Sequence, residues 1–294
     1  MKWKEILFYL ALLTIIILIL KYINNYYDSK EGFSQCSSFS LKTNNDIYDE
    51  FYVNIYDTLH KTSNNTEYEY YSILKTTQPD ENSVILDIGS GTGNLLNKFD
   101  ENGYNAHGLE KSKDMIEYSK NKNKLLSIRQ GDATDPMTFD KGTFTHICCL
   151  DFTIYHIKDK KIFFRNCYNW LLPNGYLILH LVNKEKYDTS VKSANPFLSD
   201  NPQNYSKKRI LNTNINFIDF NYLNNTEFKN DNKVVIKETF TNSSNKVRQN
   251  ELTLYMEDLD EILKISQNIG FIAHSKITYP LDKEQFIYIL EKQL

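Results

Sequence analysis

Few of the residues that mark specialised architectures occur in this chain of 294 residues. It has only 10 glycines and 6 prolines, which excludes collagen-like and low-complexity chains. The 34 Lys and Arg residues are outnumbered by 37 Asp and Glu residues, for a net charge of −3. Without a basic excess, nucleic acid is not expected as a partner. Apolar residues make up 41% and charged residues 24%, enough for the core of one large domain or two small ones.

Cysteine is also scarce. The four cysteines are Cys36, Cys148, Cys149 and Cys167, and no two of them form a C-x-x-C pair. Neither a zinc site nor a disulfide framework is therefore expected, and no metal is predicted. Cys148 and Cys149 lie in an apolar run that is typical of a buried strand. This usage favours a reducing compartment.

One long apolar run stands near the beginning of the sequence. Residues 6–20 (ILFYLALLTIIILIL) carry no charge, and Trp3 and Tyr22 extend the run to about the 20 residues that span a bilayer. No small-x-small cleavage site follows. We predict an uncleaved, single transmembrane helix over residues 1–23, with a cleaved signal or an interfacial helix as alternatives. Residues 24–46, rich in Ser and Asn, are predicted to be a linker.

The remaining sequence, residues 47–294, is predicted to be one domain. Short β-branched or apolar runs alternate there with segments of helical length, which indicates βαβ units and a parallel, doubly wound Rossmann-like sheet. The predicted strands cover residues 84–88, 105–110, 126–130, 144–150 and 176–182. The predicted helices between them cover residues 94–101, 112–121 and 160–172.

The most informative segment is V-I-L-D-I-G-S-G-T-G-N, at residues 84–94. An apolar strand runs into a glycine-rich turn, and a helix follows. Glycines suit such a turn because it is tight and a ligand approaches the backbone closely. The spacing G-x-G-x-G, with Asn94 in place of a further glycine, differs from the dinucleotide fingerprint G-x-G-x-x-G.

This segment resembles the first motif of the class I S-adenosylmethionine-dependent methyltransferases. Three further motifs resemble that family in the expected order. They are Gly108-Leu109-Glu110-Lys111-Ser112, Gly131-Asp132-Ala133 and Leu171-Leu172-Pro173-Asn174-Gly175-Tyr176. In the last motif, Asn174 replaces a glycine at a turn that tolerates Asn. The resemblance covers roughly residues 47–182 and implies a class I methyltransferase fold with S-adenosylmethionine as cofactor.

The resemblance also implies roles for single residues. Glu110 would hold the two ribose hydroxyls, Asp132 would accept the adenine amino group, and Lys111 and Met115 would flank the adenine. Leu150 and Asp151 end the fourth predicted strand. Ligands bind outside the carboxyl ends of parallel strands, so these two residues are expected to face the methionine end of the cofactor and the substrate. The predicted cofactor-binding residues are Asp87, Gly89, Ser90, Gly91, Gly93, Glu110, Lys111, Met115, Asp132, Ala133, Leu150 and Asp151. A surface acid at Glu110, an Asx-turn at Asp132 and core packing of Met115 are the structural alternatives.

Two catalytic candidates follow the fourth predicted strand. Tyr155 and His156 would lie where a general base is needed if the methyl acceptor must lose a proton. A hydrogen-bonded structural histidine is the alternative for His156. Upstream, Tyr48, Tyr52 and Tyr56 recur at helical spacing. Such a helix covers the cofactor in related methyltransferases, whereas packing onto the sheet would explain the spacing equally well.

The C-terminal part differs in pattern. Residues 183–255 contain a polar loop and then three alternating runs, at residues 215–223, 233–240 and 246–255. We predict an antiparallel sheet inserted after the fifth strand. A helix over residues 256–269 and an antiparallel pair at residues 271–279 and 285–290 are predicted to complete the main sheet.

These patterns predict a membrane-anchored S-adenosylmethionine-dependent methyltransferase that acts on a small-molecule or lipid acceptor. The alternatives are a catalytically inactive cofactor-binding membrane scaffold and, disfavoured by Asn94, an oxidoreductase. The lysines that flank the apolar run are nearly balanced and do not fix its orientation. The catalytic domain is expected in the cytosol, where S-adenosylmethionine is made.

Overall fold

The computed structural model describes residues 9, 12–19, 38–60, 62–194 and 202–293. Among them, no helix is both long enough and apolar enough to cross a membrane. Most of the anchor predicted over residues 1–23 lies outside the described residues. Within residues 12–19, which are helical, the Leu and Ile side chains are 45–64% exposed.

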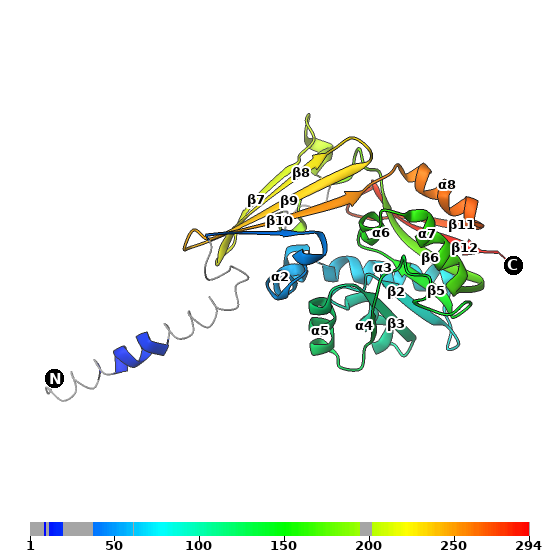
Figure 1. Cartoon of the computed structure of the whole chain (residues 1–294), viewed down its shortest axis with the longest axis horizontal. Helices are drawn as coiled ribbons and strands as arrows, with labels where there is room; N and C mark the ends of the chain where they lie inside the picture. The colour runs from blue at the N-terminus through cyan, green and yellow to red at the C-terminus, as the bar shows by residue number, and fades with distance from the viewer. Residues whose placement is uncertain (1–8, 10–11, 20–37, 61, 195–201, 294) are drawn as a thin grey trace.

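The main sheet has seven strands in the order β11-β12-β6-β5-β2-β3-β4. Strands β4, β3, β2, β5 and β6 are mutually parallel, and β12 is antiparallel to both of its neighbours. This confirms the predicted doubly wound arrangement and the closing antiparallel pair (Figure 1). The strands are β2 (Val84–Ile88), β3 (Asn105–Glu110), β4 (Ser127–Gln130), β5 (Phe144–Cys149), β6 (Leu171–Val182), β11 (Phe271–Thr278) and β12 (Gln285–Lys292).

Both faces of the main sheet are buried, as is usual for parallel strands. Helices α3 and α4 pack on one face, where Ile85 and Ile178 point, and α7 and α8 pack on the other, where Leu86 and Leu177 point. The helices are α2 (Glu50–His60), α3 (Thr62–Thr77), α4 (Asn94–Glu101), α5 (Lys113–Lys122), α6 (Thr153–His156), α7 (Lys160–Trp170) and α8 (Leu259–Ile269). Short 3₁₀ helices are η1 (Asn44–Ile47), η2 (Lys192–Ala194) and η3 (Pro202–Tyr205).

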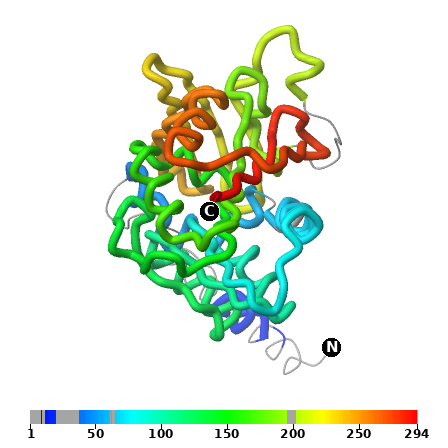
Figure 2. The backbone as a smooth tube through the Cα atoms, turned by 90° about the vertical axis from the view of Figure 1, so that its right-hand side faces the viewer, coloured from blue at the N-terminus to red at the C-terminus, as the bar shows by residue number. Residues whose placement is uncertain are grey.

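A second sheet has five strands in the order β1-β10-β9-β8-β7. They are β1 (Phe39–Thr43), β7 (Asn212–Asn216), β8 (Phe220–Phe228), β9 (Lys233–Asn242) and β10 (Val247–Tyr255). Strands β7 to β10 form the antiparallel insertion predicted after the fifth strand, and β1 pairs in parallel with β10. Figure 2 shows this yellow-to-orange part at one end of the molecule and the blue-green strands and helices at the other.

Two predicted boundaries differ from the structure. Residues 39–46, assigned to the linker, form β1 and most of η1. Their partner strand β10 lies about 200 residues away and leaves no local signal. The run at residues 215–223 is not one strand. It turns back between Asn216 and Phe220, where the Phe217 N–H donates to the Phe220 carbonyl at 2.9 Å, and the alternating pattern continues across this turn.

A buried polar network attaches the N-terminal segment to the second sheet. Arg248 of β10 is fully buried and donates to both carboxylate oxygens of Asp49 at 2.8 and 2.9 Å, to Asn250 and to the Ile47 carbonyl. Buried charges are tolerated only when paired and hydrogen-bonded in this way. We call residues 44–60, which comprise η1 and α2, the lid, because the network holds them beside the carboxyl ends of the main strands.

Candidate active site

The glycine turn after β2 has a backbone that other residues adopt poorly. Gly89, Gly91 and Gly93 have φ angles of +70°, +52° and +78°, in the left-handed region that favours glycine. A Cβ on Gly89 would lie 2.5 Å from the side chain of Thr153, and one on Gly93 would lie 2.9 Å from Ser119. A Cβ on Gly91 would meet only the Gly89 carbonyl oxygen, at an ordinary contact distance of 3.8 Å, so Gly91 is constrained mainly by its φ angle. The turn therefore depends on glycine for two separate reasons.

Glu110 ends β3 with its carboxylate fixed toward this turn. Its Oε2 accepts the Gly91 N–H at 3.0 Å, and its Oε1 accepts the Ser112 N–H at 2.8 Å. Ser112 also caps α5 by accepting the Met115 N–H at 3.1 Å. The carboxylate is thus held in a single orientation, with capacity left to accept from a ligand, because each oxygen has two lone-pair sites.

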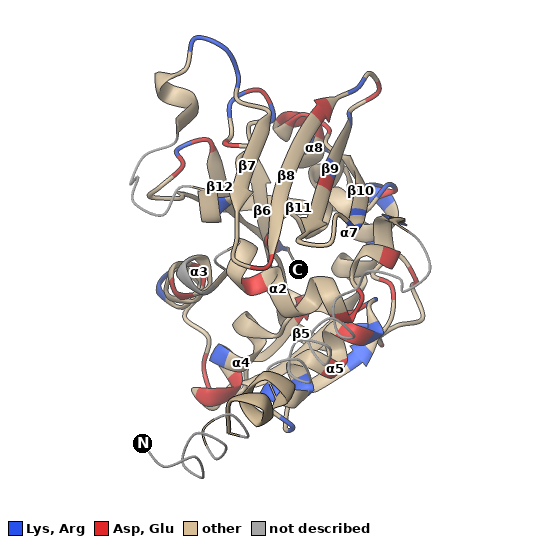
Figure 3. Ribbon diagram, turned by 90° about the vertical axis from the view of Figure 1, so that its left-hand side faces the viewer, with Lys and Arg blue, Asp and Glu red and all other residues tan. Residues whose placement is uncertain are grey.

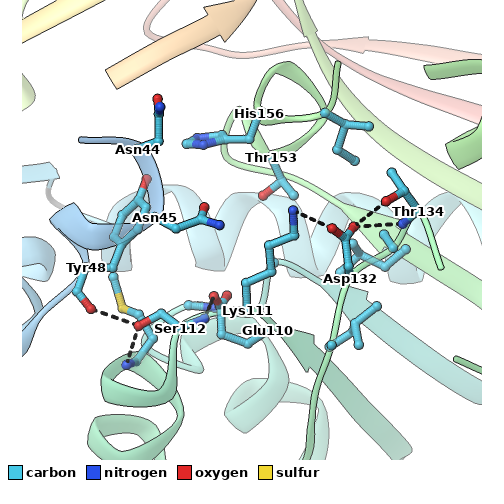
Figure 4. A pocket seen from close by; sticks show the side chains of 18 of the residues that line it. Asn44, Asn45, Tyr48, Glu110, Lys111, Ser112, Asp132, Thr134, Thr153 and His156 are labelled. Carbon is cyan, nitrogen blue, oxygen red and sulfur yellow. Dashed lines mark hydrogen bonds and ion pairs between the residues drawn. The ribbon is translucent and has the colours of Figure 1, made fainter. Parts of the chain in front are cut away.

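Asp132 follows β4 and is held similarly. Its Oδ1 accepts the Thr134 N–H at 2.8 Å, and its Oδ2 pairs with the Lys111 ammonium at 2.8 Å (Figure 4). Partial burial raises the pKa of Asp132, but the bonds from Lys111 and Thr134 outweigh it and lower that pKa below its ordinary value. Asp132 is therefore ionised at neutral pH.

These motifs meet at one cavity of about 540 Å³. The predicted site residues that line it are Gly89, Gly91, Glu110, Lys111, Met115, Asp132, Ala133, Asp151 and His156. A smaller pocket of about 80 Å³ shares Gly89, Gly91 and Asp151 with this cavity and is also lined by Asp87, Ser90 and Leu150. Twelve of the fourteen predicted residues therefore line one of these two spaces, and the exceptions are Gly93 and Tyr155.

Tyr155 is not positioned for catalysis. It is fully buried in the core on the α7 side of the sheet, and its hydroxyl accepts the Val182 N–H at 2.9 Å. Its position one residue before His156 in the short helix α6 directs it away from the cavity, because successive helical residues point about 100° apart. The prediction of Tyr155 as a catalytic residue is therefore corrected to a core role.

His156 does line the cavity. Figure 4 shows it with Asn44 and Asn45 on the side opposite Glu110 and Ser112. Burial and, to a smaller extent, the nearby Lys111 ammonium lower the pKa of His156 to about 4, although the Asp151 carboxylate acts in the opposite direction. The imidazole is therefore neutral at physiological pH and has the protonation state that a proton acceptor needs.

Asp151 lies at the carboxyl end of β5 on a strained backbone. Asp151 and Phe152 have φ angles of +46° and +66°, which cost non-glycine residues free energy and cluster at functional sites. The Phe152 ring packs against His180 and Tyr187, with centroid distances of 4.8 and 5.6 Å. This packing holds the turn so that Asp151 faces the cavity, where the Tyr56 hydroxyl donates to its carboxylate at 3.4 Å.

The lid forms part of the cavity wall. Tyr48 and Tyr56 line it, in the region where the tyrosine spacing predicted a covering helix, while Tyr52 instead donates to Glu238 of the second sheet at 3.0 Å. Asn44 and Asn45, and β10 residues 252, 253 and 255, also line it and were not predicted. Asn44 and Asn45 reach the cavity because β1, which precedes them, pairs with the distant strand β10, so no local sequence signal identifies them.

Asp57 was also missed by the sequence analysis. From α2 it accepts the hydroxyls of Thr92 at 2.6 Å and Thr62 at 2.8 Å, the amide of Asn94 at 3.0 Å and the ammonium of Lys122 at 2.6 Å. These partners belong to the glycine turn, α3, α4 and α5. One carboxylate therefore ties the lid to the elements that surround the glycine turn.

Comparisons with known proteins agree with this geometry. Residues 86–179 match the family described as "Methyltransferase domain". Phosphoethanolamine N-methyltransferase of Plasmodium falciparum is 29% identical over 131 residues, which are 41% of this chain, and the chain spans about half (48%) of that protein.

Solved structures share the fold at low sequence identity. An S-adenosylmethionine-dependent methyltransferase from Clostridium acetobutylicum has a TM-score of 0.62 at 18% identity, covering 83% of this chain and 98% of that one. CalS10, an amino pentose methyltransferase from Micromonospora echinaspora solved with bound cofactor, has a TM-score of 0.55 at 14% identity, covering 79% and 91%. Residues 86–179 thus match a methyltransferase domain, and the chain shares the fold of S-adenosylmethionine-dependent methyltransferases.

The described residues fit S-adenosylmethionine, the cofactor of this domain. Glu110 presents a fixed carboxylate suited to a vicinal diol. Burial raises the pKa of Asp87 well above its ordinary value, and the carboxyls of Glu69, Glu110 and Asp151 raise it further. A cationic sulfonium and an ammonium group would relieve this crowding of carboxyl groups.

Proposed function

We propose that this protein transfers a methyl group from S-adenosylmethionine to a small-molecule or lipid acceptor, and that it does so at a membrane. The observation that carries the proposal is the convergence of Glu110, Asp132 and the glycine turn on one cavity that also holds Asp151 and His156. The cofactor-binding roles predicted for these residues support cofactor binding at one end of the cavity. They leave the carboxyl end of β5 for the acceptor, as the switch-point rule expects.

Methyl transfer requires little covalent chemistry from the protein itself. The cofactor supplies a methyl group on a sulfonium sulfur, which leaves as a thioether after in-line displacement by the acceptor. The protein's role is to orient the acceptor near the methyl group. This positioning lowers the entropy cost of reaching the transition state. An acceptor that carries a proton must also lose it, and we assign that proton to a ring nitrogen of His156, which burial keeps neutral.

Within this class we favour an amine acceptor. Asp151 faces the cavity and makes no ion pair with another described residue, so its charge is available for a cationic ligand group. Tyr48, Tyr56 and His156 line the same cavity, and the ring centroid of Tyr48 lies 6.3 Å from that of each of the other two, so the cavity also offers aromatic faces that suit a cation. The curated relative from Plasmodium falciparum methylates the amine of phosphoethanolamine, according to its name, and CalS10 acts on an amino pentose.

Membrane attachment and location are further parts of the proposal. The uncharged run at residues 6–20 supports a single-pass anchor, and the exposed Leu and Ile side chains of residues 12–19 need an apolar environment. A cytosolic catalytic domain would have access to the cofactor. The alternative is an inactive cofactor-binding membrane scaffold.

The first test is binding of S-adenosylhomocysteine to the full chain in detergent, measured by calorimetry. Glu110→Ala removes a fixed carboxylate that we expect to make charge-assisted hydrogen bonds worth about 1.5–3 kcal/mol each. We expect its affinity to fall by roughly 100-fold or more. Glu117→Ala, on the exposed face of the adjacent helix α5, is the matched control and should bind like the unmodified protein.

The second test is transfer of a radiolabelled methyl group to panels of amines, carboxylic acids and phenols. We expect turnover with an amine, a raised KM for Asp151→Asn and a lowered kcat for His156→Gln. Binding without turnover on any panel would favour the scaffold. Absence of binding by the folded protein would refute the methyltransferase proposal.

A further inference from the structure

We propose that one end of the second sheet, which we call the sheet tip, rests on the surface of the lipid bilayer. The tip comprises Ser38 before β1, the turn at residues 217–220 between β7 and β8, and the turn at residues 242–246 between β9 and β10. The inference rests on the membrane anchor proposed above, and it adds a specific docking surface to it.

Strand register places the three segments at the same end of the sheet. Phe39 pairs with Val247, Val247 with Thr241, Thr241 with Asn221, and Asn221 with Asn216. These five residues form one row across all five strands. The chain beyond this row consists of the tip segments, which Figure 1 shows together at the left end of the sheet.

The tip presents apolar side chains to solvent. Ile218, at the apex of the β7–β8 turn, is 102% exposed, and Leu41 and Phe39 on β1, the strand at the opposite edge of the sheet, are 52% and 50% exposed. The rings of Phe217 and Phe220 pack behind the apex with centroids 5.0 Å apart. A fully exposed Ile side chain beside two aromatic rings is unfavourable in water, whereas burial in the apolar layer of a bilayer would be favourable.

Charge at the tip permits approach to a neutral lipid surface. Asp219 and Lys246 are the two charged residues among the described tip residues, and their charges cancel. The other polar residues of the tip are Ser and Asn, which can hydrogen-bond to headgroups. In Figure 3, which views this side of the molecule, Lys and Arg are interspersed with Asp and Glu. Docking therefore depends on apolar insertion and not on anionic lipids.

The point at which the chain enters the folded domain favours this end of the molecule as the membrane-facing one. The chain enters the folded domain at the tip, because Ser38 and Phe39 are the first described residues of the domain. Residues 20–37 join it to the apolar run, and 18 residues span at most about 60 Å when fully extended. An anchor in the bilayer would thus be joined to the domain at the tip, which favours the tip over the far end of the main sheet as the part that meets the membrane.

Docking through the tip would also determine how far the cavity lies from the membrane surface. Thr253 and Tyr255 line the cavity and lie six and eight positions beyond Val247 on β10. At about 3.3 Å per residue, they are about 20–26 Å along the strand from the tip row. The cavity would then open into water above the headgroups, which fits an acceptor that reaches it from solution.

The test uses the full chain with Cys36→Ser, reconstituted in phosphatidylcholine vesicles. The remaining cysteines are buried, so Ile218→Cys can carry a fluorophore. Met137→Cys, at an 83% exposed position in the main-sheet half, is the matched control. Lipids with nitroxide headgroups should quench the label at 218 several-fold more strongly than the label at 137.

Each outcome decides a different proposal. Protein that does not float with the vesicles would refute the anchor and the docking together, whereas methyl transfer by that protein would leave the proposed enzymatic activity intact. Protein that floats with equal quenching at both positions would refute the docking alone. A label at 218 that is shielded from a soluble quencher but not quenched by lipid would indicate a protein partner and would also overturn the proposal.

Discussion

The two sheets differ in what they bury on the faces turned toward the rest of the protein. The main sheet buries aliphatic side chains on both faces, and its polar residues of interest stand at the carboxyl ends of its strands. The second sheet buries Arg248, Glu238, Asn250 and Asn224 beside a few aromatic rings. Apolar packing has no preferred direction, so the main sheet can hold different polar residues at the ends of its strands without losing its core. The second sheet instead binds the lid through hydrogen bonds and an ion pair, which are directional.

The directional contacts make the second sheet the more sensitive to single polar substitutions. Arg248→Met removes the partner of Asp49 and should lower the free energy of unfolding by about 3–5 kcal/mol. Ile178→Val, in the main-sheet core, should cost only about 0.5–1.5 kcal/mol. Urea unfolding followed by circular dichroism measures both. Equal losses in the two variants would remove the distinction between the sheets.

The main sheet should be the more sensitive to acid. Burial lowers the pKa values of His146 in β5 and His180 in β6 to about 4. Each is neutral in the folded state, so its contribution is complete above the unfolded pKa of about 6.5 and is lost as the pH falls through about 4. For the fully buried His180, the shift corresponds to about 3 kcal/mol. Unfolding measured from pH 7 to 4 should show the decline, and His180→Gln should make it shallower; an unchanged slope would contradict the prediction.

Substitutions in the glycine turn test a steric constraint at the carboxyl end of β2 in the main sheet. Gly89→Ala places a Cβ against Thr153 and should cost about 3 kcal/mol from overpacking and the left-handed φ angle. Gly91→Ala has space for its Cβ and should cost only the strain of its φ angle, about 1–2 kcal/mol. Calorimetry of S-adenosylhomocysteine binding and thermal unfolding should rank the two in this order. Gly103→Ala, with a positive φ and open space, controls for backbone strain alone.

The smallest effect concerns one bond inside the polar network. The Tyr222 hydroxyl donates to Glu238 at 2.8 Å, and the Tyr52 hydroxyl donates to the same oxygen at 3.0 Å. Tyr222→Phe should therefore lower stability by about 1.5 kcal/mol. In a double-mutant cycle with Tyr52→Phe, the two losses should be non-additive, because the hydroxyls share an acceptor. Additive losses would mean that the network behaves as separate bonds.

The sequence predicted the main sheet well for a physical reason. Its parallel strands are short apolar runs followed by helices, a pattern that can be recognised within a short stretch of sequence. The glycine turn and the acids that end the strands can be recognised in the same way. Glu110 and Asp132 lie at the cavity because β3 and β4 end there, a consequence of parallel strand direction. Leu150 and Asp151 were placed at the correct edge by the same argument.

The parts that were missed depend on partners distant in sequence. Strand β1 contains only five residues and exists because β10 pairs with it, so residues 39–43 looked like linker. Asn44 and Asp57 reach the site through the lid, whose position depends on Arg248. For Tyr155 and His156, adjacent in the sequence, only the orientation of the short helix α6 decides which one faces the cavity.

The pairing of Asp49 with Arg248 has a consequence for the order in which the molecule assembles. The two residues are 199 positions apart, so the lid is among the first parts of the domain to leave the ribosome and among the last to find its partner. Until β10 has been synthesised, the lid can be held beside the glycine turn and the strand ends only by contacts such as those of Asp57, without Arg248. The wall that β10 contributes to the cavity is therefore completed only when residues up to Tyr255 have been made, and a product truncated before β10 would lack it.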